Sequence, residues 1–128
     1  MTTELMLLVW AVALTVVQML IAVAGHTQQV GVPALAGNRD GIAAPTGWAG
    51  RAKRAHLNMI ENLPLFAGLV LVAHAAGIST SLTVLGAQLF FWGRLAYAVI
   101  YLAGIPWLRT LSWAVSVVGL VLIFLQLV

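Results

Sequence analysis

Four long apolar stretches organise this chain. They cover residues 5–24, about 54–77, 82–103 and 107–128, and little chain remains between the last three. A helix needs about 20 apolar residues to cross the hydrocarbon core of a bilayer. The pattern therefore predicts an all-α integral membrane protein, a four-helix bundle that forms a single domain over residues 1–128. We expect the first stretch to be a retained span rather than a signal peptide, because it follows Glu4 instead of a basic segment.

One connection is long. Residues 25–50 are rich in glycine and contain Pro33 and Pro45. These residues predict a loop with at most a short helical turn. Long loops in compact proteins are often functional, but a surface tether fits the sequence equally well.

Composition supports a membrane setting, with 62% hydrophobic and 7% charged residues. The chain has no cysteine, which excludes disulfides, thiolate metal sites and a sulfur nucleophile of its own. Any thiol chemistry must use a thiol that a ligand brings. The three histidines are scattered, without a spacing that would place metal ligands on one helix face, so we expect no metal.

The basic residues are placed unevenly along the chain. The first connection and its edges hold Arg39, Arg51, Lys53 and Arg54, the third is followed by Arg109, and the second has no charge. Positive charge marks the cytoplasmic side of a membrane protein. We therefore expect the first and third connections in the cytoplasm and both termini on the opposite side. In a membrane protein this charge reports orientation, and we expect no nucleic-acid partner.

Polar residues within the spans fall on helical stripes. At about 100° per residue, one stripe of the second span holds Arg54, Asn58 and Glu61, and one of the third holds Arg94, Tyr97 and Tyr101. By helical rise, Glu61 lies roughly 10 Å deep and Arg94 roughly 10–15 Å. An ionised side chain near the bilayer centre costs about 2.5–3.5 kcal/mol or more. These two charges should therefore meet each other, a polar ligand or water.

Two interpretations follow from this depth. Glu61 and Arg94 could form a buried ion pair that fixes helix register, with Asn58 and the tyrosines as hydrogen-bonding partners. Together with Arg109, however, the stripes supply more donors than one carboxylate can accept. That excess favours a pocket for an anionic ligand rich in hydrogen-bond acceptors.

The stretch "RAKRAHLNMIENLPLF" closely resembles the second-helix motif of the MAPEG family, the membrane-associated proteins in eicosanoid and glutathione metabolism. That motif reads approximately R-A-H/Q-x-N-x-x-E-x-x-P-x-F. The third span, "GRLAYAVIYLAGIPWLRT", is similar to the family's following signature of arginines and tyrosines. The "GNRD" loop and compact length look more like the bacterial branch, which implies the bacterial inner membrane.

The resemblance implies a homotrimer with glutathione bound between neighbouring subunits on the cytoplasmic side. By position, Arg109 matches the arginine thought to stabilise the thiolate, and Thr110 matches a residue near the sulfur. The other positions that match glutathione contacts or the third-helix signature are Arg54, Asn58, Glu61, Arg94, Tyr97 and Tyr101.

The implied activity is that of a glutathione transferase or peroxidase. A thiol with a pKa near 8.5 is mostly protonated at neutral pH, and a nearby guanidinium favours the thiolate. The thiolate would attack a lipophilic electrophile or a hydroperoxide that arrives from the lipid bilayer, with glutathione as co-substrate.

Two departures from the pattern leave other functions open. His26 is the only candidate for the basic residue that eukaryotic members carry after the first span, and Leu57 stands where several have an arginine. Fewer cations are compatible with a non-catalytic protein that binds a lipid or a thiol. A small multidrug exporter fits less well, because the first span has only Thr15 and Gln18 as polar residues inside it, where such exporters carry a glutamate.

Overall fold

A computed structural model describes all 128 residues and contains helices and connections only. The helices are α1 (Thr3–Val30), α2 (Val32–Ala36), α3 (Gly47–Ala75), α4 (Ser81–Ala103) and α5 (Pro106–Leu127). Four of them, all except α2, are long and apolar enough to cross a membrane. This confirms the predicted all-α fold with four candidate spans.

The helix ends follow local capping chemistry. The Thr2 hydroxyl accepts a hydrogen bond from the Leu5 amide at the start of α1. Thr80 and Thr83 form a reciprocal capping box at the start of α4, which satisfies amides that have no partner within the helix. At the other end of α4, Gly104 adopts the left-handed conformation, with φ of 83°, and lets the chain turn directly into α5.

The first connection is shorter than the loop predicted over residues 25–50. Helix α1 continues to Val30 and α3 already begins at Gly47. Gly25 and Gly50, which indicated a loop, are instead points of close contact. A Cβ added at Gly25 would lie 2.7 Å from the Ala49 Cβ, and one at Gly50 would lie 2.8 Å from the Pro45 carbonyl oxygen. Glycine at position 25 allows α1 to touch the start of α3, and glycine at position 50 allows the first connection to pack against the start of α3.

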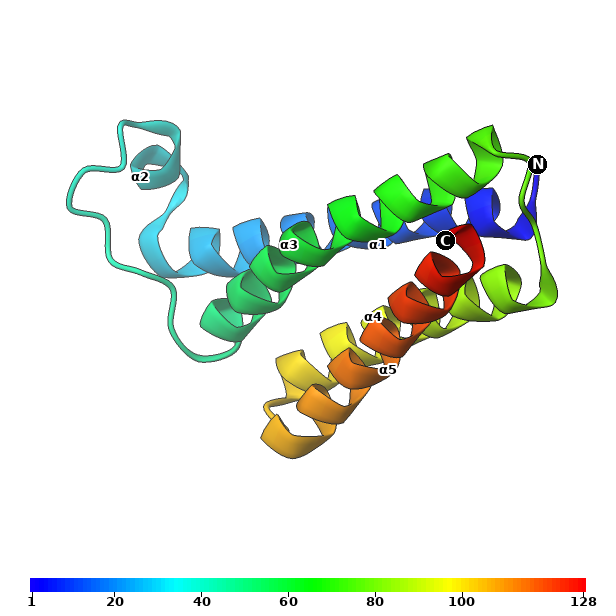
Figure 1. Ribbon diagram of the computed structural model, residues 1–128. Helices are drawn as coiled ribbons and strands as arrows, with labels where there is room; N and C mark the ends of the chain where they lie inside the picture. Colours follow the sequence, from blue (N-terminus) through cyan, green and yellow to red (C-terminus); the bar gives the residue numbers. More distant parts are fainter.

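The chain runs up and down, so its connections alternate between two ends of the bundle. Figure 1 shows α2 and its flanking loops at one end, and the N-terminus with the α3–α4 connection at the other. At that second end, Oε1 of Glu4 accepts hydrogen bonds from Ser79 (2.9 Å) and Thr83 (2.6 Å). The Thr80 hydroxyl donates to Oε1 of Gln126 over 3.0 Å. These bonds tie α1 and α5 to the start of α4.

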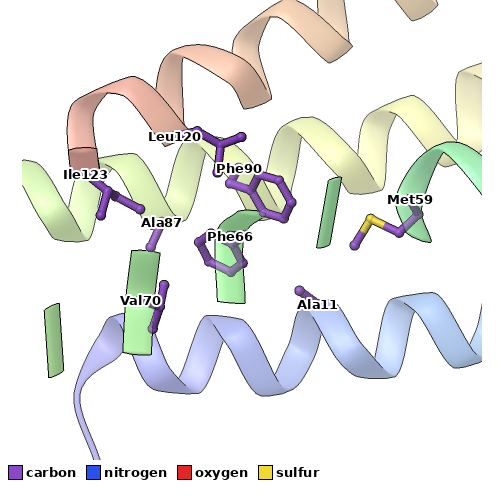
Figure 2. Close-up of a cluster of buried hydrophobic side chains, with 8 residues drawn as sticks. All are labelled: Ala11, Met59, Phe66, Val70, Ala87, Phe90, Leu120 and Ile123. Carbon is purple, nitrogen blue, oxygen red and sulfur yellow. The ribbon is translucent and has the colours of Figure 1, made fainter. Parts of the chain in front are cut away.

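The core lies between α3, α4 and the helices that flank them (Figure 2). Its centre is the stacked pair Phe66 and Phe90, whose ring centroids are 4.1 Å apart. Around them pack Ala11, Met59, Val70, Ala87, Leu120 and Ile123. Beside this core α4 and α5 meet backbone to backbone, because a Cβ at Gly86 would lie 2.6 Å from the Gly119 carbonyl oxygen. The two helices therefore form a tightly joined hairpin.

Candidate functional site

Arg94 is the most buried charged residue of the chain, with 1% of its surface exposed. Its Nη2 donates to Oδ1 of Asn58 on α3 over 2.7 Å, and its guanidinium carbon lies 4.2 Å from the centre of the Tyr97 ring. Its Nε and Nη1 are buried without a hydrogen-bond partner. Arg94 therefore holds α3 and α4 together and keeps unused donor capacity within the bundle.

Asn62 fixes the same asparagine from its other side. The Asn62 amide donates to the Asn58 carbonyl oxygen over 2.8 Å and to Oδ1 of Asn58 over 3.2 Å. Two donors, from Arg94 and Asn62, thus converge on one oxygen, and this defines which way the Asn58 amide points. The amino group of Asn58, which can only donate hydrogen bonds, remains available to a ligand beside it.

Tyr101 lies between two cationic side chains. Its hydroxyl oxygen accepts a hydrogen bond from Nε of Arg54 over 3.0 Å. Arg109 packs on its ring, with the guanidinium carbon 4.5 Å from the ring centre. The Tyr97 ring meets it edge to face at 5.5 Å. Contacts of cations with aromatic rings are worth about 0.5–2 kcal/mol, and here they hold both guanidinium groups beside the tyrosines.

A cavity of about 240 Å³ opens where these residues meet. No acidic residue lines it. The Asn58 amino group, the Arg109 guanidinium and the tyrosine hydroxyls can all donate hydrogen bonds, so the cavity suits an anion or a ligand rich in acceptors. Its walls come from α3, α4 and α5, through Asn58, Tyr97, Tyr101, Arg109, Thr110 and Trp113.

Glu61 does not join this group within one chain. It is exposed on α3, and Arg94, to which the ion-pair interpretation assigned it, is bonded to Asn58 instead. The polar stripes of α3 and α4 thus meet through the Asn58 amide and Arg94, and not through an ion pair. Thr110 lines the cavity, but its hydroxyl hydrogen is directed to the Pro106 carbonyl oxygen at 3.3 Å.

The structure adds two residues to the site predicted from the sequence. Asn62 orients Asn58, and Trp113 lines the cavity. Both stand one helical turn after a predicted site residue, four positions beyond Asn58 and Arg109. Residues four positions apart lie on the same face of a helix, so this spacing could have indicated both of them.

Elsewhere the chain has no group of three or more histidine, cysteine, aspartate or glutamate side chains that could hold a metal ion. His26, the candidate for the cation after the first span, has its Nε2 2.9 Å from the Ala43 carbonyl oxygen and holds the first connection.

Comparison with known proteins identifies the family of the chain. A scan against protein-family models matches the MAPEG family over residues 4–128, which is nearly the whole chain. No curated protein and no solved structure matches. With four apolar helices and a family match of this length, the chain is a multi-pass membrane protein that belongs to the MAPEG family.

Proposed function

We propose that this protein is a membrane-bound glutathione-dependent transferase or peroxidase. The observation that carries the proposal is the donor-lined cavity, because it combines the Arg109 guanidinium and the Asn58 amino group with no acidic side chain. Glutathione brings two carboxylates and a thiol that becomes an anion when it reacts. Membership of a family associated with glutathione supports the same ligand.

The roles follow from charge and position. Arg109 stabilises the thiolate, because its guanidinium lines the cavity and is held on the Tyr101 ring. Arg54, bonded to the same tyrosine, binds a ligand carboxylate. Glu61 accepts the ligand ammonium. Tyr97 and Tyr101 provide hydroxyl groups, Thr110 lies beside the sulfur, and Arg94 acts through Asn58.

The reaction needs no protein nucleophile. In the transferase reaction the thiolate sulfur forms a bond to an electrophilic carbon, and the leaving group departs with the bonding electrons. In the peroxidase reaction the sulfur attacks the outer oxygen of a hydroperoxide, and the alkoxide that leaves takes up a proton. The sulfur now carries the outer oxygen as a sulfenic acid. The sulfur of a second glutathione attacks this sulfur and forms the disulfide, and the S–O bond breaks so that the oxygen leaves as water. The lipophilic substrate comes from the bilayer that surrounds the apolar helices.

Replacing Arg109 with alanine tests the mechanism. We expect the rate of conjugation of glutathione to an aromatic halide to fall by about two orders of magnitude, because removal of one donor to a developing anion has an effect of this size. Glutathione binding, measured by calorimetry, should weaken less than the rate falls. Arg39→Ala, in the first connection, is the matched control. Unchanged turnover in Arg109→Ala would exclude this role for Arg109.

A homotrimer is part of the proposal. Glu61 is exposed on α3, so a single chain leaves this charge without a buried partner. A neighbouring subunit can supply partners at the same depth in the membrane. Native mass spectrometry of the protein in detergent should give three times the mass of one chain. A monomer that binds glutathione with full affinity would contradict this.

One observation favours a second function, binding without catalysis. His26 is engaged by the Ala43 carbonyl oxygen, and Leu57 is an exposed apolar residue. The cavity therefore has fewer cations than the family's eukaryotic pattern would supply. Glutathione that raises the melting temperature, with no turnover of any electrophile or hydroperoxide, would support this function against the first.

A further inference from the structure

A second cavity lies between α1, α2 and α3, at the end of the bundle that holds the first connection (Figure 1). Its volume is about 400 Å³. Seven of its twelve lining residues are hydrophobic, and the other five are His26, Thr27, Arg39, Lys53 and His56. It shares no residue with the donor-rich cavity of the candidate site. Arg39 and Lys53 therefore take no part in the thiol chemistry proposed above.

The two cations of this second cavity remain available to a ligand. Arg39 and Lys53 are both exposed, and no acidic residue lines the cavity. Nε of Arg39 donates to the Leu35 carbonyl oxygen over 2.8 Å, which holds the guanidinium at the end of α2. A guanidinium has five N–H donors, so four are left for a ligand. Together the two side chains can bind the oxygens of one phosphate.

The lining of this cavity changes from polar to apolar along the helices. On α1, Thr27 lies toward the first connection, and Val23 and Met19 lie deeper in the span. On α3, Lys53 lies toward the same connection, and Leu57 stands one turn deeper. The wall from Thr27 to Met19 is about 12 Å long, because each helical residue adds 1.5 Å. A ligand that fits this order has a charged group at one end and a hydrocarbon chain at the other.

Neither a soluble anion nor a second copy of the chain fits both features. A soluble phosphate has no part that matches the apolar wall. Subunits related by a closed rotation about the membrane normal have equivalent residues at equal depth. Glu61 stands eight residues beyond Lys53 on α3, roughly 12 Å deeper, and Glu4 lies at the opposite end of the bundle. Asp40, the only other acid of the chain, cannot by itself balance both cations.

We propose that this cavity binds one anionic phospholipid of the cytoplasmic leaflet. Arg39 and Lys53 hold its phosphate, and one acyl chain lies along the apolar wall. Basic pockets between membrane helices on the cytoplasmic side are typical sites for acidic head groups, and the expected orientation places this cavity in that leaflet. The lipid site goes beyond the proposed thiol function and does not depend on it.

Two phospholipids with the same acyl chains test the proposal, dioleoyl phosphatidylglycerol and dioleoyl phosphatidylcholine. The purified protein in detergent is titrated with each lipid, and native mass spectrometry counts the lipids bound per chain. We expect one phosphatidylglycerol per chain, bound about tenfold or more tightly than phosphatidylcholine, because each basic residue near a membrane surface contributes roughly fivefold. Glycerol 3-phosphate, which has the phosphate but no acyl chain, should not displace it.

Variants separate the cavity from general positive charge at this end of the bundle. Arg39→Gln and Lys53→Gln should each weaken phosphatidylglycerol binding about fivefold and leave phosphatidylcholine unchanged. Arg51→Gln is the matched control, because Arg51 lies outside the cavity and donates to the Leu102 carbonyl oxygen. It should keep the preference.

A change of volume gives a second readout that leaves both cations in place. Ala36→Leu, on α2, narrows the cavity and should weaken phosphatidylglycerol binding, whereas Ala34→Leu, on the same helix but outside the lining, should not.

The proposal is overturned if the wild type binds both lipids equally, or if glycerol 3-phosphate displaces phosphatidylglycerol. It is also overturned if both glutamine variants within the cavity keep the preference, if Arg51→Gln loses it to the same extent, or if Ala36→Leu binds as Ala34→Leu does. Selective binding of phosphatidylglycerol by a protein without glutathione turnover would support this site and contradict only the proposed function.

Discussion

Two hydrogen bonds converge on the side-chain oxygen of Asn58, one from Arg94 and one from Asn62. Because the oxygen is occupied, the amino group is the part of Asn58 that remains for a ligand. The same side chain rotated by half a turn would place an acceptor at the cavity and would repel a carboxylate. The preference for an anionic ligand that we propose thus depends on residues that lie outside the cavity wall.

Replacing Asn62 with leucine tests that dependence. The variant removes one of the two donors that fix Asn58 and keeps a side chain of similar size. We expect glutathione to bind about fivefold more weakly, since a typical net hydrogen bond is worth about 1 kcal/mol. The turnover number at saturating glutathione should change little. Calorimetry and steady-state kinetics measure the two effects.

Asn38→Leu in the exposed first connection is the control for this change, and it should bind glutathione as the wild type does. An Asn62→Leu protein with unaltered affinity would show that Arg94 alone is sufficient to orient Asn58.

Helical periodicity predicted part of the arrangement of these side chains, but not all of it. It placed Asn58, Tyr97 and Tyr101 on inward stripes, and the structure brings these residues together at one cavity. It also gave Glu61 and Arg94 similar depth, but depth does not determine rotation about the helix axis. Glu61 points outward, while Arg94 reaches Asn58. The residue pattern of one helix does not determine how the neighbouring helix is rotated about its own axis.

At the level of elements, the close approach of α4 and α5 depends on residues without side chains. A Cβ at Gly86 would lie 2.6 Å from the Gly119 carbonyl oxygen and 2.7 Å from Cγ1 of Ile123. Small residues at helix contacts are a common basis of association in membranes, where the hydrophobic effect no longer drives helices together. Gly93 extends this contact, since a Cβ there would lie 3.1 Å from the Ser112 carbonyl oxygen.

Two alanine substitutions separate contact from helix propensity. Gly86→Ala should lower the free energy of unfolding by about 1–3 kcal/mol, because the added methyl forces the helices apart. Gly68→Ala, on α3, meets nothing within 4 Å and should raise it by about 0.5–1 kcal/mol. Unfolding in mixed micelles, followed by circular dichroism, measures both. Equal shifts of the same sign would contradict the assigned packing.

The sequence predicted the number of long helices because apolar length is a direct physical requirement of a bilayer. It did not predict the ends of the first connection. Glycine favours loops in general, but at Gly25 the missing side chain allows contact between α1 and α3, and at Gly50 it allows contact between α3 and the Pro45 carbonyl oxygen. Distinguishing these two uses of glycine requires knowing the neighbouring helix, which local sequence does not give.

At the level of the whole molecule, the two ends of the bundle differ in charge. Arg39, Arg51 and Arg109 lie at the end formed by the first and third connections. The opposite end has the buried Glu4 with its hydroxyl partners. By the positive-inside rule we expect the first of these ends to face the cytoplasm. The donor-rich cavity lies near this end, because Tyr101 and Arg109 flank the turn between α4 and α5.

Single cysteines test this orientation on a chain that has none of its own. In spheroplasts, a maleimide that cannot cross membranes should label Ser81→Cys, at the start of α4, and should not label Asn38→Cys. Both positions are exposed, so accessibility within the chain is matched. Inverted vesicles should give the opposite result. Labelling of Asn38→Cys in intact spheroplasts would reverse the assigned topology.

The contact between Gly86 and Gly119 also affects how a ligand can enter the donor-rich cavity. Tyr97 and Tyr101 belong to α4, and Arg109 belongs to α5. Because these two helices are closely joined, two walls of the donor-rich cavity should move together. The third wall, Asn58, is carried by α3. We therefore expect the donor-rich cavity to widen only when α4 and α5 move together away from α3. The stacked rings of Phe66 and Phe90 would be the point about which they rotate.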